Sequence, residues 1–201
     1  MDTVAIACFD GFDELDAIGP YEVFETAALA GAPWDVSLRT LRDQPTVTAS
    51  HGLSIGAEGR LADSAPDLLV VPGGGWADGA DAGARAEAER GRLPDALASA
   101  HDAGTTVAGV CTGGMLLERA GLLDGRPAVT HGDAMRDLRA SGAEVVDARV
   151  VDDGDVLTAG GVTAGLDLAV HVVEREWGPS VADAVTTEME YEPRGSVHRT
   201  G

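Results

Sequence analysis

The sequence contains no lysine. All fourteen of its basic residues are arginine, against 34 acidic residues, which gives the 201-residue chain a formal net charge of −20. Such a charge repels nucleic acids and anionic membranes, so neither is expected as a partner. A dense, evenly spread carboxylate surface is typical of proteins that work at high salt, where repulsion between carboxylates is screened. The composition therefore predicts a halophilic source.

Long apolar stretches and cysteines are equally scarce. No run approaches the roughly 18 to 20 apolar residues of a membrane-spanning helix, and the N-terminal residues lack the basic region of a signal peptide. Two cysteines, Cys8 and Cys111, make no disulfide framework and favour a reducing compartment. We therefore expect a cytoplasmic protein with one domain over residues 1–191 and a loose C-terminal tail over residues 192–201.

Short apolar runs alternate with helical patterns along the chain. This alternation predicts an α/β fold, a doubly wound and mostly parallel sheet sandwiched by helices. Strands are expected over residues 3–9, 34–41, 67–71 and 105–110, with hairpins over residues 46–55 and 147–159. Helices are expected over residues 20–30, 84–103, 163–177 and 180–189.

Residues 105–117, TTVAGVCTGGMLL, contain the strongest signal for chemistry. An apolar run leads to Cys111, glycines follow, and helix-forming residues begin at Met115, which predicts a strand, a sharp turn and a helix. Gly109, Cys111 and Gly113 match the G-x-nucleophile-x-G spacing, in which glycines relieve crowding around a strained nucleophile. The following helix is expected to favour a thiolate at Cys111 through its positive end. A buried, inert cysteine is the alternative.

Asp16 is the first candidate partner for this cysteine. In a doubly wound sheet, ligands bind beyond the carboxyl ends of the strands, so the loops after the predicted strands meet at one edge. Asp16 lies in such a loop between apolar residues, where loss of solvent raises the pKa of a carboxyl and allows proton exchange near neutrality. Glu14 and Glu22 are rival acids, and a helix-capping role for Asp16 stays open.

Two further loops reach the same edge of the predicted sheet. Gly73 and Gly74 follow a strand and are candidates for lining a pocket with their backbone amides, although a bare turn has the same composition. His131 also ends a strand and is a candidate for polarising Cys111 or contacting a substrate, with a structural hydrogen bond as the alternative. The histidines and cysteines show no metal-ligand spacing, so no metal is expected.

Five segments, taken together, resemble the ThiJ/PfpI family. They are LDAIGPYEVF at residues 15–24, PGG at 72–74, GVCTGG at 109–114, TH at 130–131 and GGVTAGLD at 160–167. They occur in the family's order, and the resemblance as a whole covers about residues 4–191. The resemblance implies a flavodoxin-like, class I glutamine amidotransferase-like fold, and the Cys-Thr-Gly elbow is most similar to the isonitrile hydratase branch.

The resemblance also implies a reaction, the cysteine-dependent addition of water to a small isonitrile to give an N-substituted formamide. It implies Cys111 as the nucleophile, Asp16 as its acid/base partner and Thr112 as a contributor at the nucleophile. Gly73 and Gly74 would line the pocket. A homodimer and the absence of any cofactor belong to the same expectation. Thr112 stands where the protease-like branch has a histidine, which argues against peptidase chemistry.

Two other functions stay open at this point. The same nucleophile serves glyoxalase or deglycase reactions on 2-oxoaldehydes, although those branches usually offer a glutamate where this chain offers Asp16. An elbow cysteine also oxidises readily, so a non-catalytic redox or ligand sensor is the third interpretation.

The halophilic hypothesis is tested by the salt dependence of stability. Because salt screens the repulsion between carboxylates, the thermal unfolding midpoint should rise by about 5 °C or more from dilute buffer to molar KCl, equivalent to roughly 2 kcal/mol. Calorimetry or circular dichroism measures this midpoint. Full stability in dilute buffer, with no gain from KCl, would contradict the hypothesis.

Overall fold

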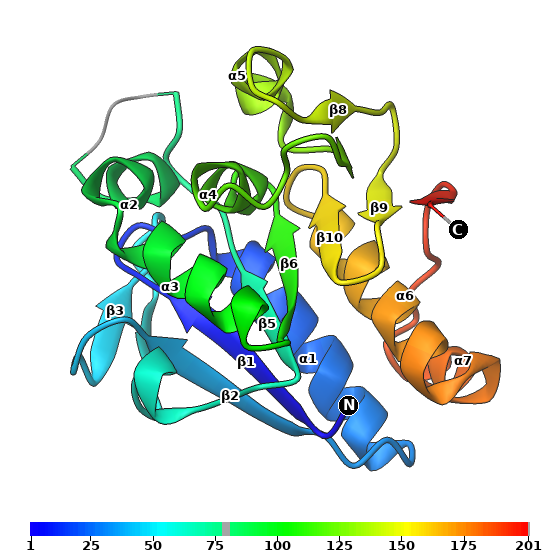
Figure 1. The fold of residues 1–201 in the computed structure, drawn as a ribbon. Coiled ribbons are helices and arrows are strands. Elements are labelled where there is room, and N and C mark those ends of the chain that lie inside the picture. Colours follow the sequence, from blue (N-terminus) through cyan, green and yellow to red (C-terminus); the bar gives the residue numbers. More distant parts are fainter. Residues whose placement is uncertain (78–80, 201) are drawn as a thin grey trace.

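A computed structural model describes residues 1–77 and 81–200 (Figure 1). Its main sheet has the strand order β11-β9-β10-β6-β5-β1-β2, with only the β9–β10 pair antiparallel among the described strands. The predicted α/β fold with a mostly parallel sheet is confirmed. The strands are β1 (Thr3–Cys8), β2 (Asp35–Thr40), β5 (Leu68–Val71), β6 (Thr106–Val110), β9 (Val150–Asp152), β10 (Val156–Ala159) and β11 (Val197–Arg199).

Helices cover both faces of this sheet (Figure 1). On one face α1 (Glu14–Leu29), α6 (Ala164–Trp177) and α7 (Pro179–Glu188) pack together, and on the other α2 (Ala84–Arg90), α3 (Arg92–Asp102) and α4 (Gly113–Arg119) do so. Within residues 1–77 and 81–200, no helix combines the length and the apolarity needed to cross a membrane.

Shorter strands and helices lie in the loops between the main elements. The predicted hairpin near residues 46–55 is confirmed as the antiparallel pair β3 (Thr46–Thr48) and β4 (Ser54–Gly56). The remaining elements are β7 (Pro127–Ala128), β8 (Glu144–Val145), α5 (Met135–Arg139) and two short 3-10 turns, η1 (Leu61–Asp63) and η2 (Gly132–Ala134).

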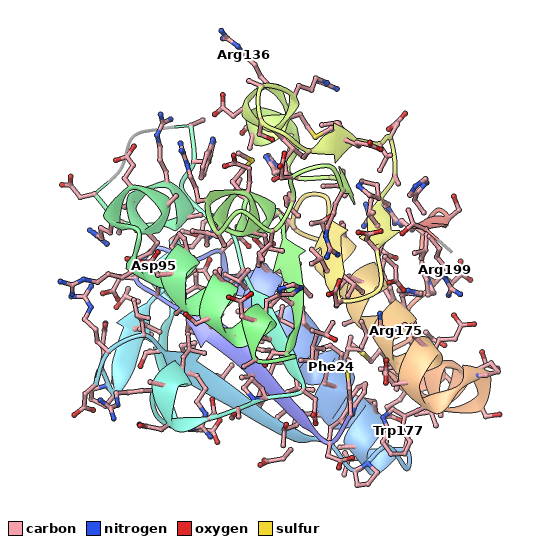
Figure 2. All side chains as sticks on the ribbon, in the orientation of Figure 1. Phe24, Asp95, Arg136, Arg175, Trp177 and Arg199 are labelled. Atoms are coloured by element: carbon pink, nitrogen blue, oxygen red, sulfur yellow. The ribbon has the colours of Figure 1, made fainter. Side chains whose placement is uncertain are left out.

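The core is formed by the apolar strands and a small aromatic cluster. All four residues of β5 are buried, as are all residues of β6 after its first. Phe24 of α1 stands edge-on to Trp34, with ring centroids 5.2 Å apart, and Trp34 meets Trp177 of α6 at 6.2 Å. Phe24 and Trp177, both labelled in Figure 2, belong to the helices α1 and α6, which pack against each other. The few aromatic residues thus join the helices of one face.

β1 is the point at which successive strands change the side on which they join the sheet. The chain passes from β1 through α1 to β2 on one side, whereas β5 pairs with the other side of β1, and β6 and β10 follow outward from it. In sheets of this kind, ligands bind at the carboxyl ends of the strands beside the reversal. The loops after β1, β5 and β6 are therefore the place to look for a site.

Two predicted helices differ from those observed. The first helix begins at Glu14 rather than at Pro20, because the Asp13 side chain accepts a hydrogen bond from the Leu15 amide (3.2 Å) and caps the helix there. Pro20 consequently lies inside α1, where it leaves the Asp16 carbonyl without its usual helical donor. The single helix predicted over residues 84–103 is two helices, since Gly91 adopts a left-handed conformation between them (φ 76°).

The prediction of a loose tail over residues 192–201 is wrong for residues 197–199. These residues form β11, which pairs in parallel with β9, about 50 residues earlier in the chain. Arg199 of β11 donates to His171 Nδ1 (3.2 Å), and Tyr191 donates to the buried Asp167 (2.8 Å). The tail is therefore fastened at both ends, while Gly201 lies outside the described residues.

The turn from β6 to α4 leaves no room for side chains at its glycines. A Cβ added at Gly113 would collide with the carbonyl oxygen of Val71 at the end of the neighbouring strand. Gly132, by contrast, has no atom within 4 Å of an added Cβ, and its φ is not in the left-handed region. The two glycines form a matched pair for testing how tightly the turn is packed.

We expect Gly113→Ala to destabilise the protein by about 2–3 kcal/mol, because the backbone must move to admit the methyl group. Gly132→Ala should change the free energy of unfolding by no more than about 1 kcal/mol, with a gain as the expected sign. Urea unfolding of both variants measures the difference. Equal effects of the two substitutions would show that the β6–α4 turn is not crowded.

Candidate active site

Cys111 occupies a strained turn at the end of β6. Its φ of 57° is left-handed, a rare conformation for a residue with a side chain, and only 5% of its surface is exposed. Its amide donates to the carbonyls of Ala159 (3.1 Å) and Gly160 (3.0 Å), and its carbonyl accepts from Thr130 Oγ1 (2.8 Å). The end of β10 and the segment after β7 therefore fix the backbone of Cys111, and the predicted strand, sharp turn and helix around it are confirmed.

Asp16 lies beside Cys111 in the first turn of α1 and is completely buried. Its Oδ2 accepts a hydrogen bond from the Gly73 amide (3.0 Å), while among the described residues Oδ1 has no conventional partner. The Cys111 thiol is the carboxyl's other polar neighbour. Burial, together with the charge of Asp13, raises the pKa of Asp16 to about 8, against the smaller lowering effects of Gly73 and Cys111. The raised carboxyl pKa predicted from the apolar sequence around Asp16 is thus confirmed.

Thr112 and the glycines of the β5 loop form the frame of the site. Thr112 Oγ1 accepts from the Gly74 amide (2.9 Å), and a Cβ on Gly73 would lie 2.5 Å from the Thr112 nitrogen and 3.0 Å from Asp16 Oδ2. Gly73 therefore permits the close approach of Thr112 and Asp16. The amides of Gly73 and Gly74 already donate within the protein, so they are not free donors for a substrate. That the two glycines line a substrate pocket stays a prediction.

The backbone amides of Val162 and Thr112 lie near the Cys111 sulfur and act to lower the pKa of its thiol. Burial and the neighbouring Asp16 carboxyl nevertheless dominate, and they raise the pKa of Cys111 to about 12. The expectation that the helix start favours a thiolate is therefore wrong. α4 begins only after Cys111 and is two turns long, so its dipole cannot offset the loss of solvent.

The two raised pKa values describe one coupled pair. At neutral pH the Asp16 carboxyl and the Cys111 thiol both retain their protons, since ionising either would place a charge in a buried, poorly solvated position. A neutral carboxylic acid beside a neutral thiol can donate a proton and accept another in the same step. This is the chemical capacity of the site.

Val162 is a residue of this site that the sequence did not reveal. It lies in the loop between β10 and α6 and has a φ of 38°, which is rare for a β-branched side chain. In the sequence GGVT, a left-handed conformation would be expected at one of the glycines, and no feature of the sequence indicates that the valine adopts it.

His131 lies against the same loop, beside Gly161. A Cβ on Gly161 would approach His131 Nε2 to 3.1 Å. Nδ1 of His131 accepts a hydrogen bond from the Asp133 amide (3.2 Å), so the neutral ring carries its proton on Nε2. The imidazole therefore borders the loop that reaches the sulfur, and its expected contact with a substrate stays a prediction.

A shallow surface depression opens beside Val162, at the outer edge of the site. It is lined by Asp13, Glu14, Leu15, His51, Leu53 and Val162. Leu15 and Leu53 are among the few large apolar side chains left exposed. The depression therefore combines an apolar wall with a charged rim.

The charged rim consists of Glu14 and His51. His51 Nδ1 lies 2.6 Å from Glu14 Oε2, and the His51 amide donates to Glu14 Oε1 (2.8 Å). Burial favours the neutral form of Glu14, but these hydrogen bonds outweigh it and lower the pKa of Glu14 to about 2. Glu14 is thus a poor proton donor, and Glu22 is exposed on α1, so Asp16 is the remaining candidate acid.

Glu14, His51 and Asp13 place their oxygen and nitrogen atoms within 4.8 Å of one another, a spacing in which a metal ion fits. Sequence spacing missed this group because His51 comes from the β3–β4 hairpin, 37 residues after Glu14. The hydrogen bonds within the group already satisfy Glu14.

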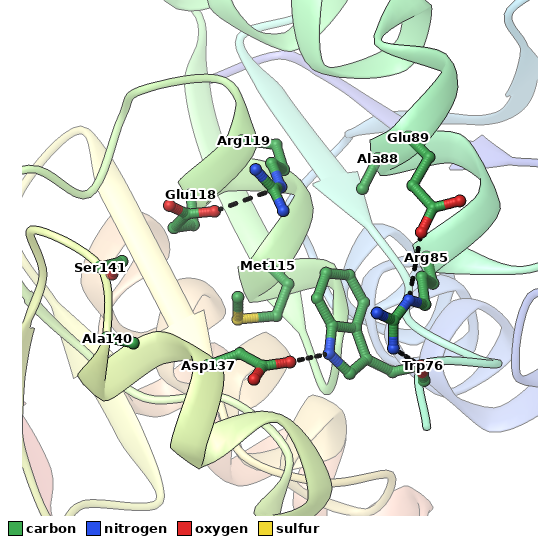
Figure 3. Close-up of a pocket in the computed structure, with 10 residues that line it drawn as sticks. All are labelled: Trp76, Arg85, Ala88, Glu89, Met115, Glu118, Arg119, Asp137, Ala140 and Ser141. Carbon is green, nitrogen blue, oxygen red and sulfur yellow. Dashed lines mark hydrogen bonds and ion pairs between the residues drawn. The ribbon is translucent and has the colours of Figure 1, made fainter. Parts of the chain in front are cut away.

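A separate pocket lies on the far side of α4 and contains neither Cys111 nor Asp16 (Figure 3). Trp76 forms its wall, fixed by a hydrogen bond from Nε1 to Asp137 (2.8 Å) and covered by Arg85, whose guanidinium lies 5.8 Å from the ring. Met115 of α4 reaches this pocket, which shares no lining residue with the depression beside Val162.

A comparison of the chain with models of protein families agrees with the geometry around Cys111. The model of the DJ-1/PfpI family matches residues 2–175. The chain belongs to the DJ-1/PfpI family. The expected ThiJ/PfpI resemblance is thereby confirmed.

Similar proteins include an enzyme and a regulator. The chain is 34% identical over 192 residues to isonitrile hydratase of Pseudomonas putida, covering 94% of this chain and 78% of that protein. It is 31% identical over 150 residues to the HTH-type transcriptional regulator CdhR of Pseudomonas aeruginosa, covering 73% of this chain and 42% of the regulator. A solved structure of a ThiJ/PfpI family protein from Pseudomonas syringae matches 96% of this chain and 76% of that chain with a TM-score of 0.82 and 26% identity. Membership of the DJ-1/PfpI family therefore leaves the reaction to be argued from the site.

The raised pKa of Asp16 predicts how stability depends on pH. In the unfolded chain this carboxyl ionises near its ordinary value, whereas in the folded protein it keeps its proton up to about pH 8. Between these pH values the chain therefore takes up a proton when it folds. The contribution of Asp16 to the free energy of unfolding consequently falls as pH rises. In Asp16→Asn this loss is absent, so the stability of the variant relative to wild type should grow by roughly 2–4 kcal/mol from pH 5 to pH 8.

Urea unfolding at several pH values measures this difference. Glu22→Gln is the matched control, because Glu22 is an exposed carboxyl on the same helix, and its stability should run parallel to wild type. Parallel curves for Asp16→Asn and wild type would mean that Asp16 is ionised in the folded protein.

Proposed function

We propose that this member of the DJ-1/PfpI family is a cysteine-dependent hydratase that converts a small isonitrile and water into an N-substituted formamide. The observation that supports it most is the buried, neutral pair of Asp16 and Cys111. The 34% identity to isonitrile hydratase over nearly the whole chain supports the choice of substrate. A homodimer remains part of this proposal.

The chemistry of an isonitrile suits such a pair, because its terminal carbon must gain both a nucleophile and a proton. In the first step Asp16 gives its proton to this carbon while the Cys111 sulfur attacks it, and the thiol proton passes to the carboxylate. The product is a thioimidate, R–N=CH–S–Cys111, and Asp16 ends the step protonated. One proton enters the carboxyl as another leaves, so no net charge is created in the buried site.

Water completes the reaction in the second step. It adds to the thioimidate carbon while Asp16 takes a proton from the water and gives its own to the nitrogen. The tetrahedral intermediate R–NH–CH(OH)–S–Cys111 then expels the sulfur, and its hydroxyl proton returns through Asp16 to the thiol. Formamide, thiol and protonated carboxyl result. The Thr112 and Val162 amides stabilise the partial charge on the sulfur as the C–S bond forms and breaks.

The surface around the site supports a small, partly apolar substrate. Leu15 and Leu53 offer an apolar wall beside Val162 on which the organic substituent of the isonitrile would rest. The raised thiol pKa argues against the sensor alternative, because the thiolate is the form that oxidises readily.

The proposal is tested by assaying formamide formation from small isonitriles with three variants. Cys111→Ala should lose at least about 10³-fold in kcat, because the covalent route disappears, and Asp16→Asn about 10²- to 10³-fold, because proton transfer is lost. Cys8→Ala is the matched control, since Cys8 is equally buried with a pKa of about 12 but lies inside β1, and its activity should stay within about twofold.

The pH dependence adds a second criterion. Because the protonated carboxyl is the active form, kcat/KM of the wild type should be level at neutral pH and fall above about pH 8. Equal rates in wild type and Cys111→Ala would eliminate the cysteine mechanism. Lactate from methylglyoxal, with no formamide from isonitriles, would favour the glyoxalase alternative.

A further inference from the structure

Arg149 and Asp167 form a buried ion pair next to the site that the proposed reaction does not use. Asp167, in the first turn of α6, is 5% exposed, and its Oδ2 accepts a hydrogen bond from Arg149 Nε. Arg149 precedes β9 and is only partly exposed. An ion pair taken out of water costs free energy unless its geometry is well satisfied, so its presence beside the loop that reaches Cys111 calls for a role.

The loop concerned runs from Gly160 to Thr163 and contacts Cys111 twice. The Gly160 carbonyl accepts the Cys111 amide (3.0 Å), and the Val162 amide approaches the Cys111 sulfur. Within this loop Val162 adopts a φ of 38°, a conformation that costs a β-branched residue roughly 1–3 kcal/mol. Such strain persists only where the surroundings hold it.

Arg149 holds this loop with both its side chain and its backbone carbonyl. Its Nη2 donates to Thr163 Oγ1 (2.7 Å), directly after Val162, and its backbone carbonyl accepts from the Gly160 amide (3.0 Å). Its Nε is held by Asp167 at the same time. Arg149 thus holds the loop on either side of the strained residue, with its backbone carbonyl at Gly160 and its guanidinium at Thr163, and the guanidinium also ties the loop to α6 through Asp167.

The C-terminal segment completes the arrangement. Asp167 Oδ1 accepts from Tyr191 Oη (2.8 Å) and from the Arg194 amide (2.7 Å), and Gly195 packs against the Arg149 side chain. With three hydrogen bonds on its two oxygens, Asp167 is held in place and in turn holds the Arg149 side chain.

We propose that Arg149 and Asp167 are positioning residues that hold Val162 in its left-handed conformation and so keep the loop of residues 160–163 against Cys111. They touch neither substrate nor sulfur and act through the loop. The kinetic consequence rests on the proposed function, whereas the positioning itself does not.

Amide hydrogen exchange followed by NMR tests the positioning without any substrate. Thr163→Val removes the acceptor of Arg149 on the loop and leaves the buried ion pair intact; Thr163 is exposed and its side chain caps no helix, so the variant should fold. Val162 should exchange at least about tenfold faster in this variant, while interior amides of β10 and α6 keep their wild-type rates.

Arg149→Lys separates positioning from stability. A lysine can still pair with Asp167, so the stability of the protein should be largely retained. A lysine lacks the second donor with which the guanidinium binds Thr163, so the Val162 amide should exchange faster. Arg126→Met is the control, because Arg126 is likewise partly buried and paired, with Asp153 and Asp155, but does not contact the loop. It should leave the Val162 rate within about twofold.

In the formamide assay, Thr163→Val and Arg149→Lys should lower kcat about tenfold with KM changed less than twofold, since the sulfur rather than substrate binding is affected. If the wild type forms no formamide, the proposed function fails, and the exchange rates alone still decide the positioning. Wild-type exchange of Val162 in both variants would overturn the proposal.

Discussion

The Asp16 carboxyl is buried with the Gly73 amide as its one conventional hydrogen-bond donor among the described residues, and the site depends on this shortage. A carboxylate in that position would need several donors to stay ionised. With one donor it keeps its proton instead, and the adjacent Cys111 thiol, facing a carboxyl in a poorly solvated space, keeps its own. The neutral pair follows from the packing around Asp16 more than from any dipole at the elbow.

The fold produces this shortage by assigning the nearby donors elsewhere. The Gly74 amide donates to Thr112 Oγ1, and the amides of Thr112 and Val162 lie near the sulfur rather than bonding the carboxyl. Val71 pairs with Gly109 and Ala159 with Val110, so β5, β6 and β10 end level with one another and their loops begin at the same height. Strand register therefore decides which backbone groups reach the carboxyl and which reach the thiol.

Local sequence signals predicted most of the fold and the two central residues. Apolar runs located β1, β5 and β6, the glycine spacing located Cys111, and the apolar neighbours of Asp16 indicated a raised carboxyl pKa. What sequence reasoning missed depends on long-range contacts. β11 exists because β9 offers it an edge, and Asp13 rather than Pro20 sets the start of α1 through a side-chain cap. The protonation of Cys111 was predicted wrongly because burial, which outweighs the helix dipole, cannot be read from neighbouring residues. Val162 was missed because its conformation is imposed from outside the loop.

The central claim is that Asp16 is a protonated carboxylic acid in the folded protein at neutral pH. The carbon-13 chemical shift of its carboxyl carbon, assigned by comparison with Asp16→Asn and followed from pH 4 to pH 10, measures this directly. The account predicts a single ionisation with a midpoint near pH 8. A midpoint near the ordinary value for aspartate, about 4, would contradict it.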